Sequence, residues 1–487
     1  MTKENKEETT GFEAYHLDKK IVKALRLLGM QKPTPIQEQV IPHILNKEDI
    51  VAQAQTGSGK TAAYAIPLCH MVDWEENKPQ VMVLTPTREL AIQVQQEIQD
   101  IGKLKRIKAP ALYGQHSFRQ QEKDLKQKSH MVVGTPGRIL DHLERETLFP
   151  GYIGYLVIDE ADEMLHMGFI EQVEEIISYL PEDRVTMLFS ATMPKEIVHL
   201  AEQYQTDPVS VKIEGEAISS QKIHHGYYNC TEEDRMDLLL KVLKVQNPDS
   251  CIVFANMRSE VEKIYDMLYE DGFRCARLHG GMEQWERTEV MRDFKKGLFR
   301  YLIATDVAAR GIDVKDISLV VNYELPSEQE TYIHRIGRTG RAGKTGKALT
   351  FIENWEVREL KQIEKKLKQD MEELSVPTEE EVEAAEEAFR TKMEQEPEEH
   401  ESRNAKLNQQ ILKLQIADGK KAKIRPVDLV GTICAIPGLE AEDIGVIHIM
   451  DWVSTVEILN GKGELVLETL QTKPIKAKVR KVTKAKY

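Results

Sequence analysis

The sequence predicts two α/β domains in tandem, each built on a parallel β-sheet, followed by a small α+β domain. The chain has 487 residues, which at about 150 residues per domain corresponds to roughly three domains. Short apolar runs alternate with amphipathic helical patterns through two long stretches, as expected for parallel sheets covered by helices on both faces. A glutamate-rich segment then precedes a final segment of different composition.

The overall composition excludes several classes of protein. Hydrophobic residues make up 41% and charged residues 30% of the chain, which is typical of a globular protein and not of a wholly disordered one. No apolar run approaches the ~18 residues that cross a bilayer, and the N-terminal segment lacks the apolar core of a signal peptide. The five cysteines are widely spaced, and no HExxH motif or paired Cys/His spacing indicates a zinc site. We therefore expect a cytoplasmic protein without a membrane partner.

The predicted strands of the two α/β domains are short and nearly continuously apolar. In the first stretch they are Ile50–Ala52, Val81–Leu84, Met131–Val133, Tyr155–Ile158 and Met187–Phe189. In the second stretch they are Cys251–Phe254, Tyr301–Ala304 and Leu319–Val321. Each run is followed by a turn and an amphipathic segment, as in parallel sheets. We expect the first domain at 1–212, a connector at 213–222 and the second domain at 223–375.

The segment 376–403 is predicted to be an acidic linker. Eleven glutamates lie between Glu379 and Glu401, against two basic residues, Arg390 and Lys392. So little apolar surface cannot offset the entropy lost on ordering the chain. The composition therefore indicates either an exposed helix or a disordered linker.

Residues 404–487 predict a strand, a helix, two strands, a helix and a final strand. The apolar segments and candidate helices are Ile411–Ile416, Pro426–Ala435, Ile444–Ile449, Thr455–Leu459 and Glu464–Leu470. This segment carries 14 lysine and arginine residues against 9 acidic residues, although the whole chain has a formal net charge of −14. A basic segment on an acidic body is typical of a polyanion-binding module, and a solvated surface with a frayed tail is the alternative.

A phosphate-binding loop is predicted between the strand Ile50–Ala52 and the next helical pattern. Glycines in the loop let successive backbone N–H groups curl around a phosphate at a helix N-terminus. Lys60 would reach the β- and γ-phosphates, and the Thr61 hydroxyl would ligate Mg²⁺. The loop comprises Ala54, Gln55, Thr56, Gly57, Ser58, Gly59, Lys60 and Thr61. Alone, this motif indicates only nucleotide binding, and a glycine-rich turn is the alternative.

Two adjacent carboxylates, Asp159 and Glu160, follow the strand Tyr155–Ile158. The carboxyl edge of a parallel sheet is where ligands bind. Asp159 is placed to hold Mg²⁺, largely through water, and Glu160 to orient and deprotonate the attacking water. The two roles need two carboxylates, because the base must remain free of the metal beside it. Without the phosphate loop, an acidic solvated turn would be the simpler interpretation.

Arg338 and Arg341 lie on a glycine-punctuated turn in the second α/β domain. Arginines delivered to a transferring phosphoryl group can accelerate the reaction by ~10³–10⁵. Because the loop and the acids belong to the first domain, the site would be complete only when the two domains close. A generic anion-binding patch is the alternative.

Together these motifs resemble those of the DEAD-box ATP-dependent RNA helicases, over roughly Phe12 to Glu353. The other motifs of that family occur in order, namely Gly29–Gln37 (GMQKPTPIQ), Pro86–Leu90 (PTREL), Thr135–Arg138 (TPGR), Ser190–Thr192 (SAT) and Ala304–Asp313 (ATDVAARGID). The resemblance implies two RecA-like domains in tandem, ATP and Mg²⁺ as cofactors, and RNA as the substrate.

The resemblance also implies individual roles. Gln37 would read adenine through its amide, and Phe12 would stack on the base, with a core anchor as the alternative for Phe12. Asp313 would contact the ATP ribose, while Ser190 and Thr192 would couple hydrolysis to strand separation. RNA-backbone contacts without sequence readout are implied for Arg88, Gly114, Thr135, Arg138 and Thr305. This chain departs from many relatives at Gly114-Gln115, where they have two glycines.

The final segment resembles the C-terminal RNA-binding domain of the bacterial DbpA-type helicases, on Lys423–Thr432, Asp443–Gly445 and Glu457–Lys462. The resemblance implies an RRM-like domain that targets a hairpin region of 23S rRNA in pre-50S particles. The aromatic residues with which an RRM sheet stacks bases are missing from the strands Ile444–Ile449 and Thr455–Leu459. We therefore expect binding through loops and basic residues, namely Lys420, Lys421, Lys423, Arg425 and the basic tail from Lys473 to Lys486. A dimerisation or stability domain is the alternative.

The resemblance as a whole implies a monomeric, RNA-dependent ATPase that unwinds short RNA duplexes non-processively during large ribosomal subunit assembly. ATP and RNA would both favour the closed form, and hydrolysis would reopen it. The alternatives are a general cold-shock or RNA-decay helicase and an ATP-switched RNA clamp with little turnover. The presence of Glu160, Ser190, Thr192 and Arg341 argues against the clamp.

Overall fold

A computed structural model describes residues 11–55, 57–213, 223–306, 317–326, 328–340, 345–395 and 404–485. The chain divides into two compact units, Met1–Ile213 with Ser402–Tyr487, and Glu214–Glu401. Except for Ile213, the predicted connector at 213–222 lies outside the described residues. Among the helices that the structure describes, none is long and apolar enough to span a bilayer.

The first unit is built on a parallel sheet of seven strands among its described residues. The strands are β1 (Ile50–Gln53), β2 (Val81–Leu84), β3 (Ala111–Leu112), β4 (Met131–Gly134), β5 (Tyr155–Ile158), β6 (Val185–Ser190) and β7 (Val209–Lys212). Their order in the sheet is β3-β4-β2-β5-β6-β1-β7. All five predicted strands are present. The apolar pattern missed β3 and β7, which form the two edges of the sheet.

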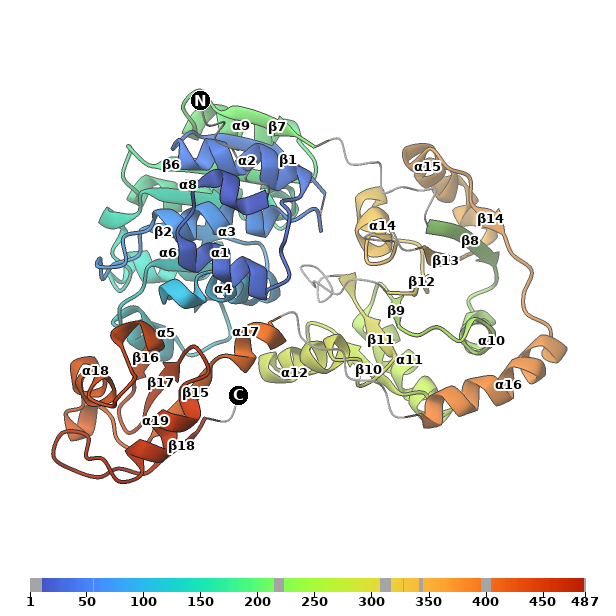
Figure 1. The fold of residues 1–487 in the computed structure, drawn as a ribbon. Coiled ribbons are helices and arrows are strands. Elements are labelled where there is room, and N and C mark those ends of the chain that lie inside the picture. The colour runs from blue at the N-terminus through green and yellow to red at the C-terminus, as the bar shows by residue number, and fades with distance from the viewer. Residues whose placement is uncertain are drawn as a thin grey trace, which may run out of the picture. The chain divides into compact units, whose positions relative to one another are not determined.

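Helices cover both faces of this sheet (Figure 1). They are α1 (Lys19–Leu27), α2 (Pro35–Leu45), α3 (Lys60–Met71), α4 (Arg88–Ile101), α5 (Phe118–Leu125), α6 (Pro136–Glu144), α7 (Ala161–His166), α8 (Ile170–Tyr179) and α9 (Lys195–Tyr204). Helices α1 to α4 contribute to one apolar core and α6 to α9 to another on the opposite face. The short 3₁₀ segments are η1 (Gly11–Tyr15), η2 (Lys103–Lys105) and η3 (Pro150–Tyr152). Strands buried on both faces explain the continuous apolar runs in the sequence.

The second unit repeats this architecture over the residues described. Its strands are β8 (Ile223–Asn229), β9 (Cys251–Phe254), β10 (Cys275–Leu278), β11 (Tyr301–Ala304), β12 (Leu319–Asn322), β13 (Gly346–Ile352) and β14 (Glu372–Glu373). They pair in parallel in the order β10-β11-β9-β12-β13-β8-β14. The helical segments are α10 (Arg235–Gln246), α11 (Arg258–Glu270), α12 (Gln284–Lys295), α14 (Gln329–Ile336), η5 (Asn354–Glu356), α15 (Val357–Leu367) and α16 (Glu379–Glu394). The three predicted strands are confirmed as β9, β11 and β12.

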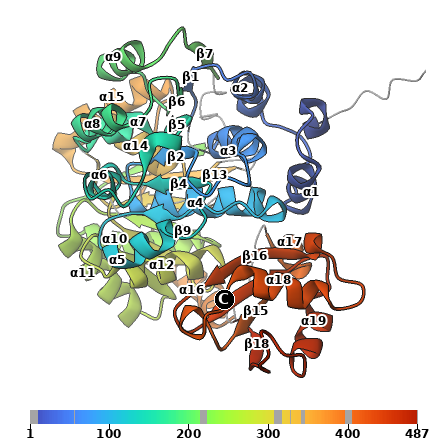
Figure 2. The same ribbon diagram turned by 90° about the vertical axis from the view of Figure 1, so that its left-hand side faces the viewer.

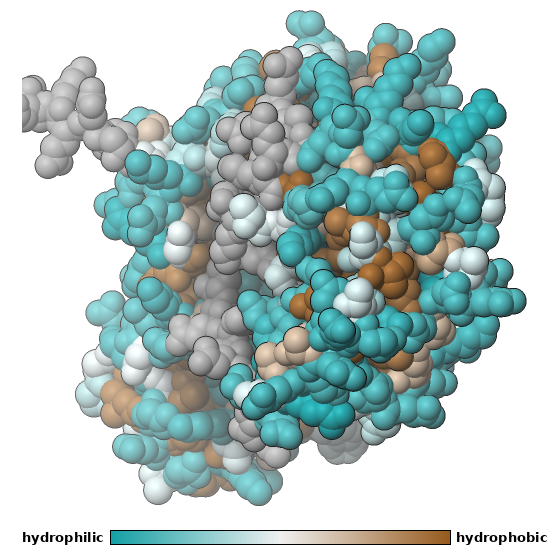
Figure 3. All heavy atoms as spheres, turned by 90° about the vertical axis from the view of Figure 1, so that its right-hand side faces the viewer, coloured by the Kyte–Doolittle hydropathy of each residue, from teal (hydrophilic) through white to brown (hydrophobic). Residues whose placement is uncertain are grey.

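In the acidic segment, Glu379–Glu394 form the helix α16, and residues 396–403 lie outside the described residues. Thr378 caps it by accepting a hydrogen bond from the backbone of Glu381 at 3.3 Å, and glutamates in the first turn suit the positive end of a helix dipole. Phe389 and Met393 are buried in the core of the second unit, and the Phe389 ring lies 4.6 Å from that of Phe273. The helix therefore has one apolar stripe that packs, while its other faces are polar. Figure 3 shows the right-hand side of Figure 1, where mainly hydrophilic residues surround small apolar areas.

The C-terminal segment folds as the predicted α+β domain. Its elements are α17 (Ala405–Gln409), β15 (Leu412–Ile416), η6 (Lys420–Ala422), α18 (Pro426–Cys434), η7 (Ala441–Asp443), β16 (Ile444–Ile449), β17 (Ser454–Ile458), α19 (Gly463–Leu470) and β18 (Val482–Lys484). The strands form an antiparallel sheet in the order β16-β17-β15-β18. Apolar residues of α18, α19 and the sheet make a separate core. The predicted order of strands and helices is confirmed.

This C-terminal domain packs on the N-terminal α/β domain of the same unit, beside α4 (Figures 1 and 2). Leu407 and Leu459 join the apolar core that α1 and α4 also line. Lys103 forms an ion pair of 2.7 Å with Glu457, whose side chain is 8% exposed. Lys108 donates a hydrogen bond of 2.5 Å to the carbonyl of Ile447 on β16. One face of the small sheet is therefore covered by basic residues of its neighbour.

Candidate functional site

The loop after β1 has the geometry of a phosphate cradle. Gly57 and Gly59 adopt φ values of 86° and 98°, which glycine reaches without strain, and Gly59 is the N-cap of α3. Lys60 is 6% exposed, and its Nζ forms no hydrogen bond with any residue that the structure describes. A buried ammonium without an acceptor is costly unless a ligand supplies one. The loop therefore fits a bound polyphosphate.

The other loop residues surround this cradle. Ser58 donates its hydroxyl to the Gln55 carbonyl at 2.8 Å, which closes the turn. Thr61 lies half-buried in the first turn of α3. Thr56 lies outside the residues that the structure describes.

Thr34 and Gln37 hold the phosphate loop from the start of α2. The Thr34 hydroxyl donates to the Ser58 carbonyl at 2.9 Å, and the Gln37 amide donates to the Gly59 carbonyl at 3.2 Å. The Gln37 side-chain oxygen accepts from the Thr34 backbone at 3.0 Å. A Cβ at position 59 would lie 2.6 Å from the Gln37 nitrogen. The amide that we expect to read adenine thus also fastens the phosphate loop, a contact that the sequence did not predict.

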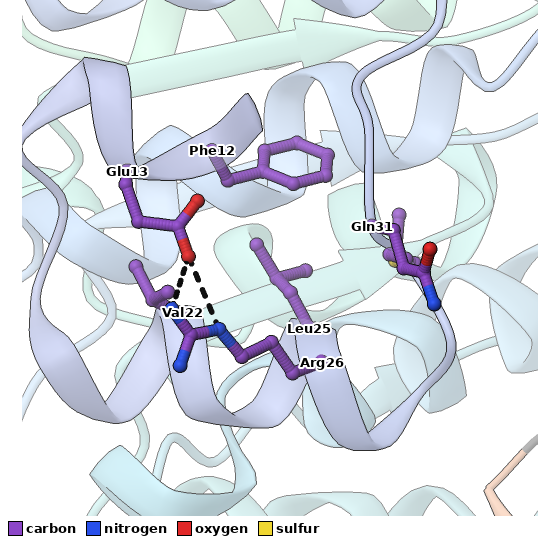
Figure 4. A pocket seen from close by; sticks show the side chains of 7 residues that line it. Phe12, Glu13, Val22, Leu25, Arg26 and Gln31 are labelled. Atoms are coloured by element: carbon purple, nitrogen blue, oxygen red, sulfur yellow. Dashed lines mark hydrogen bonds and ion pairs between the residues drawn. The ribbon is translucent and has the colours of Figure 1, made fainter. Parts of the chain in front are cut away.

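Phe12 lines a pocket of about 430 Å³ at the N-terminal edge of the first unit. Figure 4 shows its ring above Leu25, with Gln31 on one side and the bonded pair Glu13–Arg26 on the other. Arg26 donates to Glu13 at 3.1 Å. Phe12 itself is 2% exposed and belongs to the core of the unit. Its position is therefore compatible both with a wall for a bound base and with the alternative, a core anchor.

The carboxylate pair lies after β5 as predicted. Asp159 is 2% exposed and accepts hydrogen bonds from the Tyr64 hydroxyl at 2.8 Å and the Glu160 backbone at 3.0 Å. Burial raises the pKa of Asp159, against the opposing effects of Lys60, Tyr64 and the Glu160 N–H. Glu160 has a φ of 52° at the N-cap of α7, and strained conformations of this kind cluster at functional sites. Carboxylate and hydroxyl oxygens, here of Asp159 and Thr61, are the ligands that Mg²⁺ prefers.

Asp162 connects the acidic motif, which comprises Asp159, Glu160 and Asp162, to the segment Ser190–Thr192. It accepts hydrogen bonds from the Thr192 backbone at 2.8 Å and the Thr192 hydroxyl at 2.9 Å. Its own N–H donates to the Ser190 hydroxyl at 3.2 Å. Burial would raise the pKa of Asp162, but Lys60 and the bonds from Thr192 and Ser190 lower it overall. Ser190 and Thr192, predicted to couple hydrolysis to strand separation, are thus bonded directly to the acidic motif.

In the second unit, Arg335 lies three residues before the predicted catalytic Arg338 and is buried in a network of hydrogen bonds. Its side chain is 1% exposed and makes two bonds to the Asp306 carboxylate, at 2.5 and 2.7 Å. It also donates to Asn256 at 2.7 Å and to the Glu324 carbonyl at 2.9 Å. A bidentate, buried pair of this kind fixes the ends of the strands that it joins. Arg335 is therefore a structural centre of the second unit.

The predicted catalytic arginine Arg338 lies one turn further on. Arg338 is 5% exposed, and its Nε donates to the His334 carbonyl at 3.3 Å. Arg341 and Asp313, predicted to bind the γ-phosphate and the ribose, lie outside the described residues.

The predicted RNA contacts of the first unit lie together at the carboxyl edge of β2, β3 and β4. A Cβ on Gly114 would lie 3.5 Å from the Arg88 guanidinium, and Arg88 donates to the Gln115 side chain. Gln115 has a φ of 58°, which explains why glycine suits this position. The departure from the two-glycine pattern therefore places a side chain against Arg88.

Thr135 and Arg138 continue this edge at the start of α6. Thr135 is the N-cap of the helix and donates its N–H to the Leu112 carbonyl at 3.0 Å. Arg138 donates to the His116 carbonyl at 3.0 Å and to Gln121 at 2.9 Å. The remaining predicted contact, Thr305, follows β11 in the second unit and is 9% exposed.

Four of the basic residues predicted to bind RNA in the C-terminal domain are exposed, while Lys486 of the basic tail lies outside the described residues. Lys420 and Lys421 form η6, Lys423 follows with a φ of 57°, and Arg425 precedes α18. Arg480 in the basic tail differs from them, because its side chain is 6% exposed and bonds Asp418 at 2.9 Å.

Comparison with protein families identifies all three parts. The DEAD/DEAH box helicase model matches residues 34–200, the helicase conserved C-terminal domain matches 234–343, and the DbpA RNA binding domain matches 413–484. The chain is 50% identical over 474 residues to the ATP-dependent RNA helicase DbpA of Bacillus subtilis (strain 168), covering 97% of this chain and 99% of that protein. The chain belongs to the DbpA-type DEAD-box ATP-dependent RNA helicases. The family resemblance and the fold class predicted from the sequence are confirmed.

Other relatives align with a shorter part of this chain than DbpA does. The DEAD-box ATP-dependent RNA helicase CshA of Geobacillus kaustophilus is 42% identical over 369 residues, which cover 76% of this chain and 79% of CshA. The structure of S. cerevisiae Dbp5 bound to RNA and ADP BeF3 aligns with a TM-score of 0.70 and 30% identity, over 79% of this chain and all of that chain.

Three residues important to the site were missed by sequence reasoning. Tyr64 bonds Asp159, Asp162 bonds Thr192, and Arg335 holds Asp306. Asp162 and Arg335 lie within three residues of the predicted Glu160 and Arg338, so their position was a usable signal. No sequence signal indicated Tyr64, because a tyrosine in an apolar helix is normally interpreted as a residue of the hydrophobic core.

Proposed function

We propose that this helicase is an RNA-dependent ATPase that separates short RNA duplexes locally and is directed by its C-terminal domain to 23S rRNA during large ribosomal subunit assembly. The observation that carries the ATPase part is the buried Nζ of Lys60, which has no acceptor among the described residues and lies in a loop of backbone N–H groups. The oxygens of a triphosphate would supply the acceptors that this ammonium lacks.

Lys60 and the residues around it have different roles in ATP hydrolysis. Lys60 neutralises the phosphates, and Glu160 accepts a proton from the attacking water. Thr61 and Asp159 are suited to hold Mg²⁺, largely through water, and the ion's charge stabilises the charge that develops on the transferred group. Phe12 and Gln37 bind the base. Arg338 and Arg341 of the second α/β domain supply positive charge to the phosphoryl group, and Asp313 binds the ribose, so hydrolysis depends on both domains.

RNA is bound through its backbone in the first unit and through basic residues in the C-terminal domain. The residues at the edge of β2 to β4 offer a guanidinium, backbone groups and a hydroxyl, which suits contacts to phosphate and sugar. The exposed lysines of η6 give the C-terminal domain an electrostatic surface for RNA. The match to the DbpA RNA binding domain supports an rRNA target.

The alternative of a general cold-shock or RNA-decay helicase is less well supported. CshA aligns over 76% of this chain, whereas DbpA aligns over 97%, and the C-terminal domain has a fold and a core of its own. The clamp alternative conflicts with the bonded array of Asp162, Ser190 and Thr192, which links the site of hydrolysis to a neighbouring segment.

Steady-state ATP hydrolysis tests the proposal. We expect a fragment of 23S rRNA that contains the hairpin region to stimulate turnover at far lower concentrations than an unrelated RNA of the same length. Equal stimulation by both RNAs would favour the general helicase, and tight RNA binding without stimulation would favour the clamp.

A further inference from the structure

Trp452 stands at the tip of the hairpin that joins β16 to β17, and its side chain is 72% exposed. It is the one phenylalanine, tyrosine or tryptophan of residues 404–487 apart from the terminal Tyr487. The core of the C-terminal domain is therefore aliphatic, and its large aromatic ring faces solvent. A tryptophan so placed contributes little to the burial that stabilises the domain.

The hairpin is fastened to the basic segment η6 by backbone bonds. The N–H groups of Lys420 and Lys421 donate to the carbonyls of Met450 and Asp451 at 2.8 and 2.9 Å. A Cβ at Gly419 would lie 2.1 Å from the Met450 carbonyl, so the close approach depends on glycine. These contacts hold the ring beside two lysines in a defined position.

The charges around Trp452 are predominantly positive. The ammonium of Lys421 lies 5.9 Å from the centre of the Trp452 ring, and Lys420 is exposed on the same segment. Lys123 of α5 lies 3.1 Å from Asp451, the acid next to Trp452. The hydrogen bond from Lys123 and the charges of Lys420 and Lys421 lower the pKa of Asp451. One acid is thus surrounded by three lysines.

The two other strongly exposed tryptophans of the described residues differ in their surroundings. Trp355 donates its indole N–H to Glu353 at 3.1 Å. Trp285 is followed directly by Glu286 on α12. Trp452 is the member of this group that combines an exposed ring with flanking lysines.

Part of the sheet face that RRM domains use for bases is covered in this chain. Glu457 and Thr455 on β17 are 6% and 7% exposed, and Lys103 of the neighbouring domain pairs with Glu457. The β17 part of this face is therefore covered, whereas Gln415 on β15 is exposed. The ring at the end of the hairpin remains accessible.

We infer that Trp452 is a stacking platform for an unpaired RNA base, with Lys420 and Lys421 binding the adjoining phosphates. An aromatic face with cations beside it is the arrangement by which proteins bind single-stranded nucleic acid without base-specific hydrogen bonds. This inference rests on the proposed RNA targeting by the C-terminal domain and adds unpaired nucleotides as the ligand. It places the RNA contact on the hairpin instead of on the sheet.

Fluorescence anisotropy with the full-length protein tests the platform. The probes are a labelled RNA hairpin with unpaired flanking nucleotides and a fully paired RNA duplex of equal length. We expect Trp452→Ala to raise the Kd for the first probe by about 5- to 100-fold, because loss of one base–aromatic stack has an effect of this size. The Kd for the duplex should change less than about twofold, and Trp452→Phe should retain most of the affinity because it retains a ring.

Trp355→Ala is the matched control, since it removes an equally exposed indole, and we expect it to bind both probes as the wild type does. Combined Lys420→Ala and Lys421→Ala should weaken both probes and reduce the slope of log Kd against log salt concentration by about two. Wild-type affinity of Trp452→Ala for the unpaired probe would overturn the inference and point to a protein partner for the hairpin. Failure of the proposed function would show instead in the wild type, as ATP hydrolysis that RNA does not stimulate.

Discussion

Thr192 directs both its backbone N–H and its hydroxyl to the same carboxylate oxygen of Asp162, at 2.8 and 2.9 Å. Asp162 belongs to the acidic motif beside the phosphate loop, and Lys60 helps to keep its pKa low. Any movement of the acidic motif during the reaction is therefore transmitted to the segment that follows β6. This pair gives a physical basis for the coupling role proposed for Ser190 and Thr192.

Removal of the Thr192 hydroxyl should uncouple ATP use from strand separation. Hydrogen bonds to charged groups are worth about 1.5–3 kcal/mol, so we expect Thr192→Ala to slow unwinding of a short duplex at least tenfold. RNA-stimulated ATP hydrolysis should stay within a few-fold of wild type. Thr206→Ala changes an exposed threonine of the same unit and is the control. A parallel loss of both activities would assign Thr192 to catalysis itself.

The substitution Glu160→Gln should stop turnover while ATP and RNA still bind. It removes the base but leaves Lys60 and Asp159 in place, and loss of a positioned general base lowers rates by about 10²–10⁴. Binding of a fluorescent ATP analogue and single-turnover hydrolysis together measure this. Glu171→Gln on α8 is the control. Hydrolysis at the wild-type rate would refute the role of Glu160.

Arg335→Ala should destabilise the second unit severely. It removes a buried guanidinium and leaves Asp306, whose side chain is 21% exposed, and the Asn256 and Glu324 oxygens without their donor. Each acceptor left unsatisfied costs about 1–3 kcal/mol. Urea unfolding followed by far-UV circular dichroism should show an earlier transition. Arg358→Ala, at an exposed arginine of the same unit, should unfold as the wild type does. If Arg335→Ala and Arg358→Ala unfolded at the same urea concentration, the Arg335–Asp306 pair would not stabilise the unit.

The packing of the C-terminal domain should strengthen as pH rises above about 8. Burial lowers the pKa of Lys108 from 10.5 to about 8, against the attraction of Glu457. Between these pH values the unfolded chain binds a proton that the folded chain does not, so the free energy of unfolding increases with pH.

Thermal unfolding of wild type and Lys108→Met between pH 7.5 and 9.5 measures this effect. We expect the wild type to gain about 1–2 kcal/mol relative to the variant across this window, while Lys19→Met, at an exposed lysine, should show no such difference. Parallel pH profiles for wild type and Lys108→Met would show that Lys108 is not buried in this interface.

Deletion of residues 404–487 should leave basal ATP hydrolysis intact but remove any preference for 23S rRNA. The deletion also uncovers the surface against which Leu407 and Leu459 pack, so a lower melting temperature is expected. The full-length variant with alanine at Lys420, Lys421, Lys423 and Arg425 keeps that surface covered. It should lose rRNA preference without the thermal effect. An unchanged preference in both proteins would exclude targeting by this domain.

Apolar runs predicted all five inner strands of the first sheet and three of the second, but missed the inner strands β8 and β13 and all four edge strands. The strands β2, β5, β9 and β11 were located with the bounds that the structure has, because each is buried on both faces. β8 contains two histidines and two tyrosines, and β14 is Glu372–Glu373. Such segments pair because a neighbouring strand offers backbone hydrogen bonds. Their side chains do not show the apolar pattern by which a strand is predicted from sequence.

The sequence by itself determined the fold class, the order of motifs and the residue types of the nucleotide site, because each depends on local periodicity or on a short fixed spacing. Tertiary structure alone decided which side chains hold one another. Gln37 fastens Gly59, Arg335 holds Asp306, and Leu459 packs into a core built mainly by residues before 110. These contacts join residues 22 to several hundred positions apart, and no local pattern specifies such partners before the chain has folded.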